Sequence, residues 1–395
     1  MSSLRPEGFE NPDVSDVVRE IKMSPIYRRF LCVIRDYGIK TICDFHAHVS
    51  SGRNDIIETA SDESVNLLPE LPFSVRDVNR LYDILFRDEG IDFFSVVFDT
   101  PLGAYDLVKR NGRLLTDLDS MDIEEAQKIV PFAVVTPEMK GSQIKGFVER
   151  GARGFKMTPR TTSKHISRGR ISDISLADML NPEALRIANV CRLPLVVHLP
   201  QLVVSPRMKP SLRGELRRIA DKYPDLKIVL AHLGQAQTPA KIEDLVQWIC
   251  LNDLNDIIWM DVSAVTVPSV LELAFASDIK LVFGTDIDFS LTERGKYIMF
   301  KYRDGQRVLA DPGDRGAIIT ALVSTSFGEK LREFVAAKGI DLNSPLLLFQ
   351  IEGILDAIER LQKGGKPREE VKPILENLFF RNAESLFGVK GLGKG

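Results

Sequence analysis

The sequence predicts an α/β fold, a closed barrel of eight parallel strands that are each followed by a helix, known as the (β/α)8 or TIM barrel. Eight apolar runs of strand length lie between residues 40 and 286, and most are apolar throughout, as in strands buried on both faces. Helical patterns alternate with these runs, which indicates right-handed βαβ units. Histidine and aspartate residues stand at the carboxyl ends of several runs, where such barrels carry their active sites.

The eight predicted strands are built from apolar, β-branched and aromatic residues. In order they are KTICDF (40–45), DFFSVVF (92–98), PFAVV (131–135), RGFKM (153–157), LPLVVH (193–198), LKIVLAH (226–232), DIIWMDV (256–262) and KLVFGTD (280–286).

Caps and apolar periodicity define the helices between these strands. Ser74 is the predicted N-cap of the first helix, whose apolar residues recur at positions i, i+3, i+4 and i+7 before Gly90 ends it. Asn181 and Pro182 open the helix before the fifth strand, with proline at the first helical position. The next three helices are expected over 211–223, 242–249 and 269–276.

Two segments lie outside the predicted barrel. Residues 1–39 are expected to form a helical extension before the first strand, with IYRRFLCVIRDYG (26–38) as its clearest amphipathic piece. Residues 291–365 are too long for a simple loop after the eighth strand, and we expect a helical insertion beside the active face. The barrel then resumes at 367–388, so that the domain spans 40–388 with this insertion.

Charge and composition exclude several classes of protein. The 395 residues carry 52 Lys and Arg against 55 Asp and Glu, so nothing in the charge favours nucleic acid or an anionic membrane as a partner. No apolar stretch approaches the ~20 residues that span a bilayer, and the N-terminus lacks the pattern of a secretory signal. The four cysteines are widely spaced in apolar segments, so we expect reduced thiols in a cytoplasmic protein.

Four of the five histidines stand at the ends of predicted strands. His46 and His48 are two residues apart on one strand, so both side chains project from the same face and can bind one ion. His198 can supply a third nitrogen, and Asp286 can supply an oxygen from the last strand, which neighbours the first in a closed barrel. Imidazole and carboxylate are the commonest ligands of a catalytic divalent ion that activates water. His232 would face the same cavity, and we expect it to polarise the substrate's carbonyl rather than to bind the metal.

Four ordered motifs support this interpretation: DFHAH (44–48), IVLAHLGQ (228–235), FGTD (283–286) and FFRNAESLFG (379–388). They resemble signatures of the amidohydrolase superfamily, in particular of the amidohydrolase-related branch that contains aminocarboxymuconate-semialdehyde decarboxylase and dicarboxylate lactonases. Gln235 replaces the second glycine of that branch's HLGG signature. The resemblance covers residues 40–290 and 367–388.

The resemblance implies roles for individual residues. His46, His48, His198 and Asp286 would bind the metal, and His232 would assist catalysis. The expected cofactor is a divalent ion, with zinc first and manganese or another divalent ion as the alternative.

Cationic residues near the same strand ends indicate a small, anionic substrate. Lys156 stands where some superfamily members carry a carboxylated lysine that bridges two metals. We favour a single metal with Lys156 beside the substrate's anionic group. Arg160 and Arg53 are further candidate contacts, because arginine binds carboxylate or phosphate in bidentate fashion. The alternative for the loop that contains Arg160 is a solvated basic surface.

Three functions remain open at this point. The first is a metal-dependent hydrolase that uses metal-activated water on an amide, ester or lactone of a small acidic substrate. The second is a non-oxidative decarboxylase on the same metal site, a reaction that the resembling branch includes. The third is a non-catalytic scaffold barrel, against which the complete ligand set argues. The expected partner is a small-molecule substrate, and a homodimer is the commonest assembly for an oligomeric protein.

Overall fold

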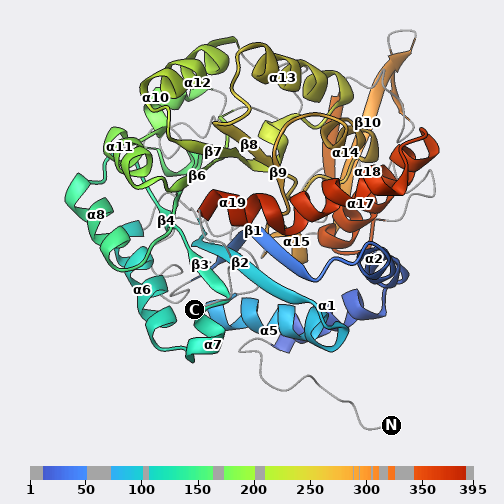
Figure 1. Ribbon diagram of the computed structural model, residues 1–395, viewed down its shortest axis with the longest axis horizontal. Coiled ribbons are helices and arrows are strands. Elements are labelled where there is room, and N and C mark those ends of the chain that lie inside the picture. The colour runs from blue at the N-terminus through green and yellow to red at the C-terminus, as the bar shows by residue number, and fades with distance from the viewer. Residues whose placement is uncertain are drawn as a thin grey trace.

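The chain folds as a (β/α)8 barrel that contains all eight predicted strands (Figure 1). The computed structural model describes residues 12–50, 73–100, 106–162, 173–200, 210–287, 289–292, 294–303, 306–310, 319–324 and 342–387. The third barrel strand is interrupted at Phe132 and is therefore divided into β3 and β4. The barrel strands are β1 (Thr41–Val49), β2 (Asp92–Asp99), β3 (Ile129–Pro131), β4 (Ala133–Val134), β5 (Phe155–Met157), β6 (Pro194–Val197), β7 (Lys227–Leu230), β8 (Ile258–Asp261) and β9 (Leu281–Val282).

Backbone hydrogen bonds close these strands into a ring. Parallel pairing runs from β1 through β2 to β3, and from β4 through the intermediate strands to β9. The two groups join at Phe132, whose amide donates to the carbonyl of Val97 at 2.8 Å. At the other seam the amide of Phe45 in β1 donates to the carbonyl of Phe283, just after β9, at 2.7 Å. The first and last strands are therefore neighbours, as the sequence predicts.

Helices surround the strands (Figure 1). Ser74 caps the first barrel helix and Asn181 caps the helix that begins at Pro182, both as predicted, and Asp77 completes a capping box with Ser74. No helix in the described part of the chain combines the length and apolar composition needed to cross a bilayer. The helices are α5 (Val75–Phe86), α6 (Leu107–Asp119), α7 (Ile123–Ala126), α8 (Gly141–Glu149), α10 (Leu176–Met179), α11 (Pro182–Cys191), α12 (Pro210–Lys222), α13 (Pro239–Leu251) and α14 (Pro268–Phe275), with short turns η1 (Arg87–Glu89) and η2 (Pro159–Thr161).

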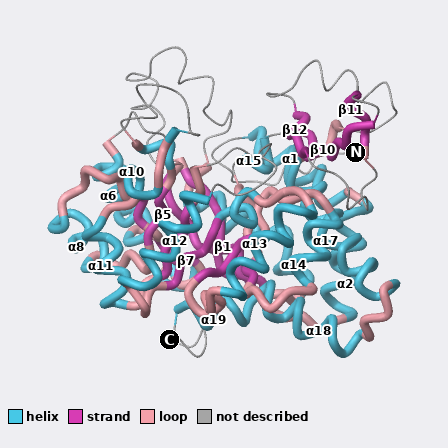
Figure 2. The backbone as a smooth tube through the Cα atoms, turned by 90° about the horizontal axis from the view of Figure 1, so that it is seen from above, coloured by secondary structure: helices cyan, strands magenta, loops and turns pink. Residues whose placement is uncertain are grey.

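The two ends of the chain supply helices outside this ring. The predicted N-terminal helices are present as α1 (Pro12–Met23) and α2 (Pro25–Asp36). The C-terminal segment contains α18 (Arg368–Glu376), the π-helical turn η5 (Asn377–Arg381) and α19 (Asn382–Phe387). Phe387 stacks on Phe45 with ring centroids 5.7 Å apart, so this segment closes the end of the barrel opposite the carboxyl ends of the strands (Figure 2).

The region after β9 differs from the predicted helical insertion. It contains α15 (Phe289–Thr292) and a three-stranded antiparallel sheet of β10 (Gly295–Arg303), β11 (Gln306–Leu309) and β12 (Ile319–Ser324). Figure 2 shows this sheet at the opposite end of the barrel from α19. β10 pairs with β11 across a connection of two residues and with β12 across a longer one, and the expectation of a helical insertion overlooked both pairings. The predicted helix EKLREFVAA (329–337) lies outside the described residues.

The last helix of the predicted insertion belongs to the barrel wall. Helix α17 (Leu346–Lys363) packs against α14 on one side and α2 on the other. A methyl group at Gly353 of this helix would lie only 2.9 Å from the carbonyl oxygen of Thr266, which follows β8. This close approach holds α17 against the carboxyl end of the barrel, next to the segments that carry the predicted site.

Candidate metal centre

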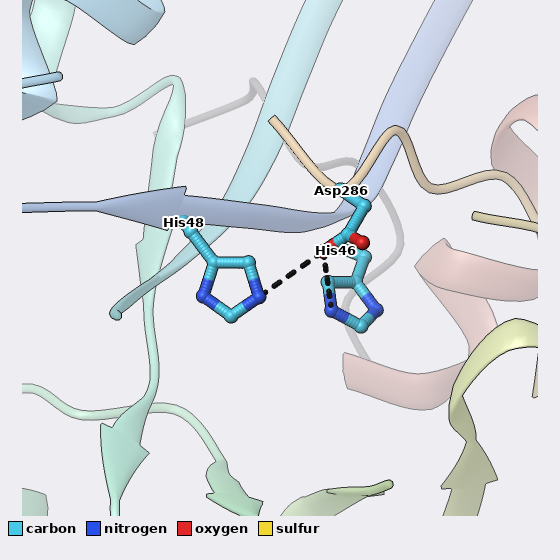
Figure 3. A group of neighbouring side chains, drawn as sticks. All are labelled: His46, His48 and Asp286. Carbon is cyan, nitrogen blue, oxygen red and sulfur yellow. Dashed lines mark ion pairs between the residues drawn. The ribbon is translucent and has the colours of Figure 1, made fainter. Parts of the chain in front are cut away.

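Three of the predicted ligands converge at the carboxyl end of the barrel. Asp286 Oδ1 lies 3.2 Å from His48 Nε2 and 3.4 Å from His46 Nε2 (Figure 3). All three side chains are buried, and their ligand atoms lie within 4.8 Å of one another. The pairing of the last and first strands brings them together, since the amide of Asp286 donates to the carbonyl of His46 at 2.7 Å. Asp44 strengthens this seam by accepting the backbone amides of His46 and Thr285 at 3.0 and 2.9 Å.

A second carboxylate fixes the orientation of the His46 ring. Asp261, the last residue of β8, is fully buried and places Oδ2 2.7 Å from His46 Nδ1. An ionised carboxylate can only accept, so Nδ1 of His46 carries the proton. Nε2 of His46 therefore keeps its lone pair on the side of Asp286, as a metal ligand requires.

His232 is held by the same carboxylate and by a serine. Its backbone amide donates to Asp261 Oδ1 at 2.9 Å, and its Nδ1 lies 3.0 Å from the carbonyl oxygen of Ser263 and 2.9 Å from Ser263 Oγ. A carbonyl oxygen only accepts, so this geometry assigns the proton to Nδ1 and the lone pair to Nε2. Ser263 Oγ in turn hydrogen bonds to Asp261 Oδ1. One serine and one aspartate therefore connect the two imidazoles.

His198 occupies a different position from the other predicted ligands. It directly follows β6, and its Nε2 lies 3.2 Å from Nε2 of Gln235, while its ring centroid is 5.0 Å from that of His232. Among the described residues, neither group of converging ligand atoms includes His198. Burial and then the neighbouring His232 hold the pKa of His198 well below its usual value. The metal-ligand role of His198 stays a prediction.

Lys156 adds a cation inside the centre. It belongs to β5, is almost fully buried, and places Nζ 3.0 Å from His46 Nε2 and 4.7 Å from the centre of the Phe98 ring. Burial lowers the pKa of the Lys156 ammonium to about 8. Arg160 is exposed on η2, and its charge further lowers the pKa of Lys156, which places the guanidinium on the same side of the barrel.

One further predicted site residue falls on a part of the chain that the structure does not describe. It is Arg53, the candidate contact to an anionic substrate.

The charges of the described residues favour a bound cation. Burial, then the nearby charge of Lys156, lowers the pKa of His46 to about 3, and burial also lowers the pKa of His48, so both imidazoles are neutral. Burial opposes ionisation of Asp286 and Asp261. Interactions with His232 and the hydrogen bond of His48 nevertheless hold the pKa of Asp286 below its usual value, and interactions with His46 and Ser263 do the same for Asp261. Two buried carboxylates thus face one lysine ammonium, and a buried charge without a partner is costly. The donor set and its charge both fit a divalent metal ion.

The backbone around the centre is strained. Seven described non-glycine residues have positive φ, and five of them lie just after β7, β8 or β9. They are His232, Leu233, Gln235, Ala264 and Asp286, with φ between 51° and 62°. Left-handed conformations cost free energy for residues with a Cβ atom, and such strain collects at functional sites. The strain therefore coincides with the strand ends that carry the candidate side chains.

The structure adds three residues that the sequence analysis missed. Asp261 is the second-last residue of a predicted strand, so its position near a strand end could have identified it, and Ser263 follows two residues later. Tyr297 lies on β10, where its backbone amide donates to Thr266 Oγ1 at 3.0 Å. Burial, and then the negative charge of Asp286, raises the pKa of Tyr297 to about 12, while a side-chain hydrogen bond to Gln237 opposes this shift. No local sequence signal distinguishes this tyrosine.

Fold and centre together define the class of protein, a (β/α)8-barrel enzyme whose active face is suited to a divalent metal ion. A family model described as amidohydrolase matches residues 43–309, and the chain belongs to the amidohydrolase family.

Comparisons with individual proteins give the following matches. No curated protein matches the chain. Among solved structures it is similar to a probable 2-pyrone-4,6-dicarboxylic acid hydrolase from Acinetobacter baumannii, with 16% identity over 88% of this chain and 99% of that chain and a TM-score of 0.47. It is also similar to amidohydrolase 2 from Bifidobacterium longum subsp. infantis, with 15% identity, coverage of 89% and 99% and a TM-score of 0.45. A dihydroxybenzoic acid decarboxylase from a Polaromonas species, with bound manganese, matches at 15% identity, coverage of 63% and 87% and a TM-score of 0.39.

Proposed function

We propose that the protein is a metal-dependent hydrolase that acts on an amide, ester or lactone of a small acidic substrate. The observation that carries this proposal is the convergence of His46 Nε2, His48 Nε2 and Asp286 Oδ1 at the carboxyl end of the barrel. Two neutral imidazoles and one carboxylate leave coordination positions for substrate or water, as in catalytic rather than structural metal sites.

His46, His48 and Asp286 would hold the ion, with His198 as the predicted further ligand. Zinc is the expected metal and manganese the alternative, since both accept imidazole and carboxylate. When bound, such an ion polarises a carbonyl group and lowers the pKa of water from about 15.7 to about 7. Lys156 remains a candidate for carboxylation as the bridge between two ions.

Protons would move between Asp286 and His232. Asp286 Oδ1 faces the two imidazoles, so Oδ2 can accept a proton from the attacking water. Nδ1–H of His232 is held by Ser263, so the lone pair of Nε2 can accept the proton that Asp286 has taken from the water. The imidazolium then donates from Nε2 to the developing oxyanion or to the leaving group. His232 would thus accept a proton before it acts as the electrophile that the sequence suggests.

Cationic side chains support the choice of an acidic substrate. Lys156 presents a buried ammonium beside His46, and the Arg160 guanidinium lies at the exposed rim. A substrate carboxylate between them would pair with both charges. Arg53 remains a proposed additional contact.

The same centre suits a decarboxylase, and this is the second candidate. The buried ammonium of Lys156 lies within hydrogen-bonding distance of a proposed ligand, so it could hold a carboxylate at the point where CO2 leaves. Membership of an enzyme family argues against the third possibility, a non-catalytic scaffold.

Metal analysis followed by an activity screen tests the proposal. Purified protein should contain zinc or manganese, and a panel of small carboxylate-bearing esters, amides and lactones should yield hydrolysis products. CO2 release without hydrolysis would instead assign the decarboxylase. Protein that stays metal-free after addition of either ion would refute both.

Two variants test the division of roles between His198 and His232. His198→Ala should remove metal and activity together. His232→Asn should keep its metal while kcat falls about 10²–10⁴-fold, as for a lost acid–base group. Loss of metal from His232→Asn would reverse the assignment of His232 as a proton carrier.

A further inference from the structure

A buried glutamine of α17 connects the ends of β8 and β9. Gln350 is fully buried, and its Nε2 donates to the carbonyl oxygens of Gly284 and Val262 at 2.6 and 3.2 Å. Its Oε1 accepts the backbone amide of Ala264 at 3.2 Å. The two amide hydrogens and the carbonyl oxygen of this one side chain are therefore all used by the backbone of two strand ends.

The peptide groups that Gln350 holds lie directly beside the supports of His46. Val262 follows Asp261, whose carboxylate fixes the His46 ring. On the other strand, Gly284 lies against His46 so closely that a methyl group there would be 2.7 Å from the Cβ atom of His46. The bonds to Gln350 thus fix the two segments that contact His46 from β8 and from β9.

The third hydrogen bond of Gln350 goes to the turn that contains Ser263, which hydrogen bonds to His232. Ala264, whose amide donates to Gln350, follows Ser263 and has a left-handed backbone with φ of 54°. Ser263 bonds to Nδ1 of His232. A strained turn keeps its shape only when surrounding contacts impose it, and the Gln350 side chain supplies one such contact.

Anchoring a helix does not by itself require an amide at this position. Helix α17 already buries apolar side chains such as Ile351 and Ile354 against the barrel. A leucine at position 350 would fill a similar volume but would remove the bonds to the Gly284 carbonyl and the Ala264 amide, while the Val262 carbonyl would still accept the amide of Val265 at 3.3 Å. The side-chain amide of Gln350 is therefore explained by its hydrogen bonds to the peptide groups after β8 and β9, and not by the packing of α17.

We infer that Gln350 is a positioning residue that sets the spacing of β8 and β9, so that Asp261 and Asp286 both reach His46. The inference rests on the proposed metal centre, whose geometry it explains. Because the side-chain hydrogen bonds of Gln350 go to the backbone of Val262, Ala264 and Gly284, its substitution should change the arrangement of the proposed ligands without removing one.

Cobalt(II) binding to the full chain tests the inference, with the visible absorption of the bound ion as a signature of its coordination. Gln350→Leu should bind cobalt about 10–100-fold more weakly than wild type, as for loss of an outer-shell partner. Leu361→Ala is the matched control, since it weakens the packing of the same helix about three turns further on. The control should be less stable to urea but should bind cobalt with the affinity and spectrum of wild type.

If Gln350→Leu does not fold, a second variant and a second measurement still test the inference. Gln350→Glu keeps the shape and the acceptor but can donate at most one hydrogen, so it should also bind cobalt more weakly than wild type. In the metal-free protein, ¹⁵N NMR of the five histidines should show a changed His46 Nδ1 signal in the Gln350 variants and an unchanged one in Leu361→Ala.

The outcomes separate the inference from the proposed function. If wild type binds no cobalt but the His46 signal still depends on Gln350, the positioning role stands and the metal-dependent function fails. Cobalt affinity and a His46 signal equal to wild type in the folded Gln350 variants would overturn the inference alone. Equal losses of cobalt affinity in Leu361→Ala and Gln350→Leu would also overturn it.

Discussion

Substitution of Asp261 by asparagine is the sharpest test of how the centre is organised. Asp261 Oδ1 accepts the backbone amides of His232 and Ser263 at 2.9 and 3.0 Å, and Oδ2 faces His46 Nδ1 at 2.7 Å. In Asp261→Asn the amide oxygen must take the Oδ1 position, where two backbone donors converge. The NH2 group then faces His46 Nδ1 and requires a lone pair there. The His46 proton moves to Nε2, the nitrogen that the metal needs.

The expected loss of metal affinity follows from this change of tautomer. A hydrogen bond to a charged group contributes about 1.5–3 kcal/mol. Substituting an outer-shell partner of a metal ligand typically lowers metal affinity about 10–100-fold, which corresponds to about 1.4–2.8 kcal/mol. The metal-free variant should keep its fold, because the amide oxygen still accepts from His232 and Ser263.

Metal titration followed by urea unfolding of the metal-free protein measures both expectations. Asp99→Asn is the control, since Asp99 is another fully buried carboxylate at the carboxyl end of a barrel strand but pairs with Arg110. This control should lose stability and keep its metal affinity. Wild-type metal affinity in Asp261→Asn, or equal losses in both variants, would refute the proposed role of Asp261.

Two further substitutions test the close packing and the polar rim of the site. In Gly284→Ala the new methyl group would lie 2.7 Å from the Cβ atom of His46, so we expect about 1–3 kcal/mol of destabilisation and a reduced metal content by elemental analysis. A variant with full metal content would show that His46 has room to move. Tyr297, with a pKa of about 12, stays a neutral hydrogen-bond donor near Asp286, so Tyr297→Phe should raise KM about 2–10-fold at unchanged metal content. An unchanged KM would place the phenol outside the substrate's reach.

The sequence alone predicted the barrel and the pair of histidines on its first strand. Each strand is a local run of apolar residues, and several helices begin with a local cap, so the eight-fold alternation is visible without tertiary information. The HxH spacing of His46 and His48 also determines locally that both rings share one face. The sheet of β10, β11 and β12 was missed for two reasons. Only two residues, Asp-Gly, connect β10 to β11, a local hairpin signal that the expectation of a helical insertion overlooked, whereas β12 pairs with β10 across a longer connection.

Local periodicity thus determined which residues stand at the strand ends, including His46, His48 and Asp286. Only the tertiary structure decided which of them meet, since Asp261 and His46 are 215 residues apart and touch because β8, β9 and β1 are successive strands of a closed ring. The same closure placed His198 beside Gln235 and brought Gln350 to the ends of β8 and β9. Hydrogen bonds of this kind depend on distances of a few tenths of an ångström, which strand spacing and helix packing set and residue order does not.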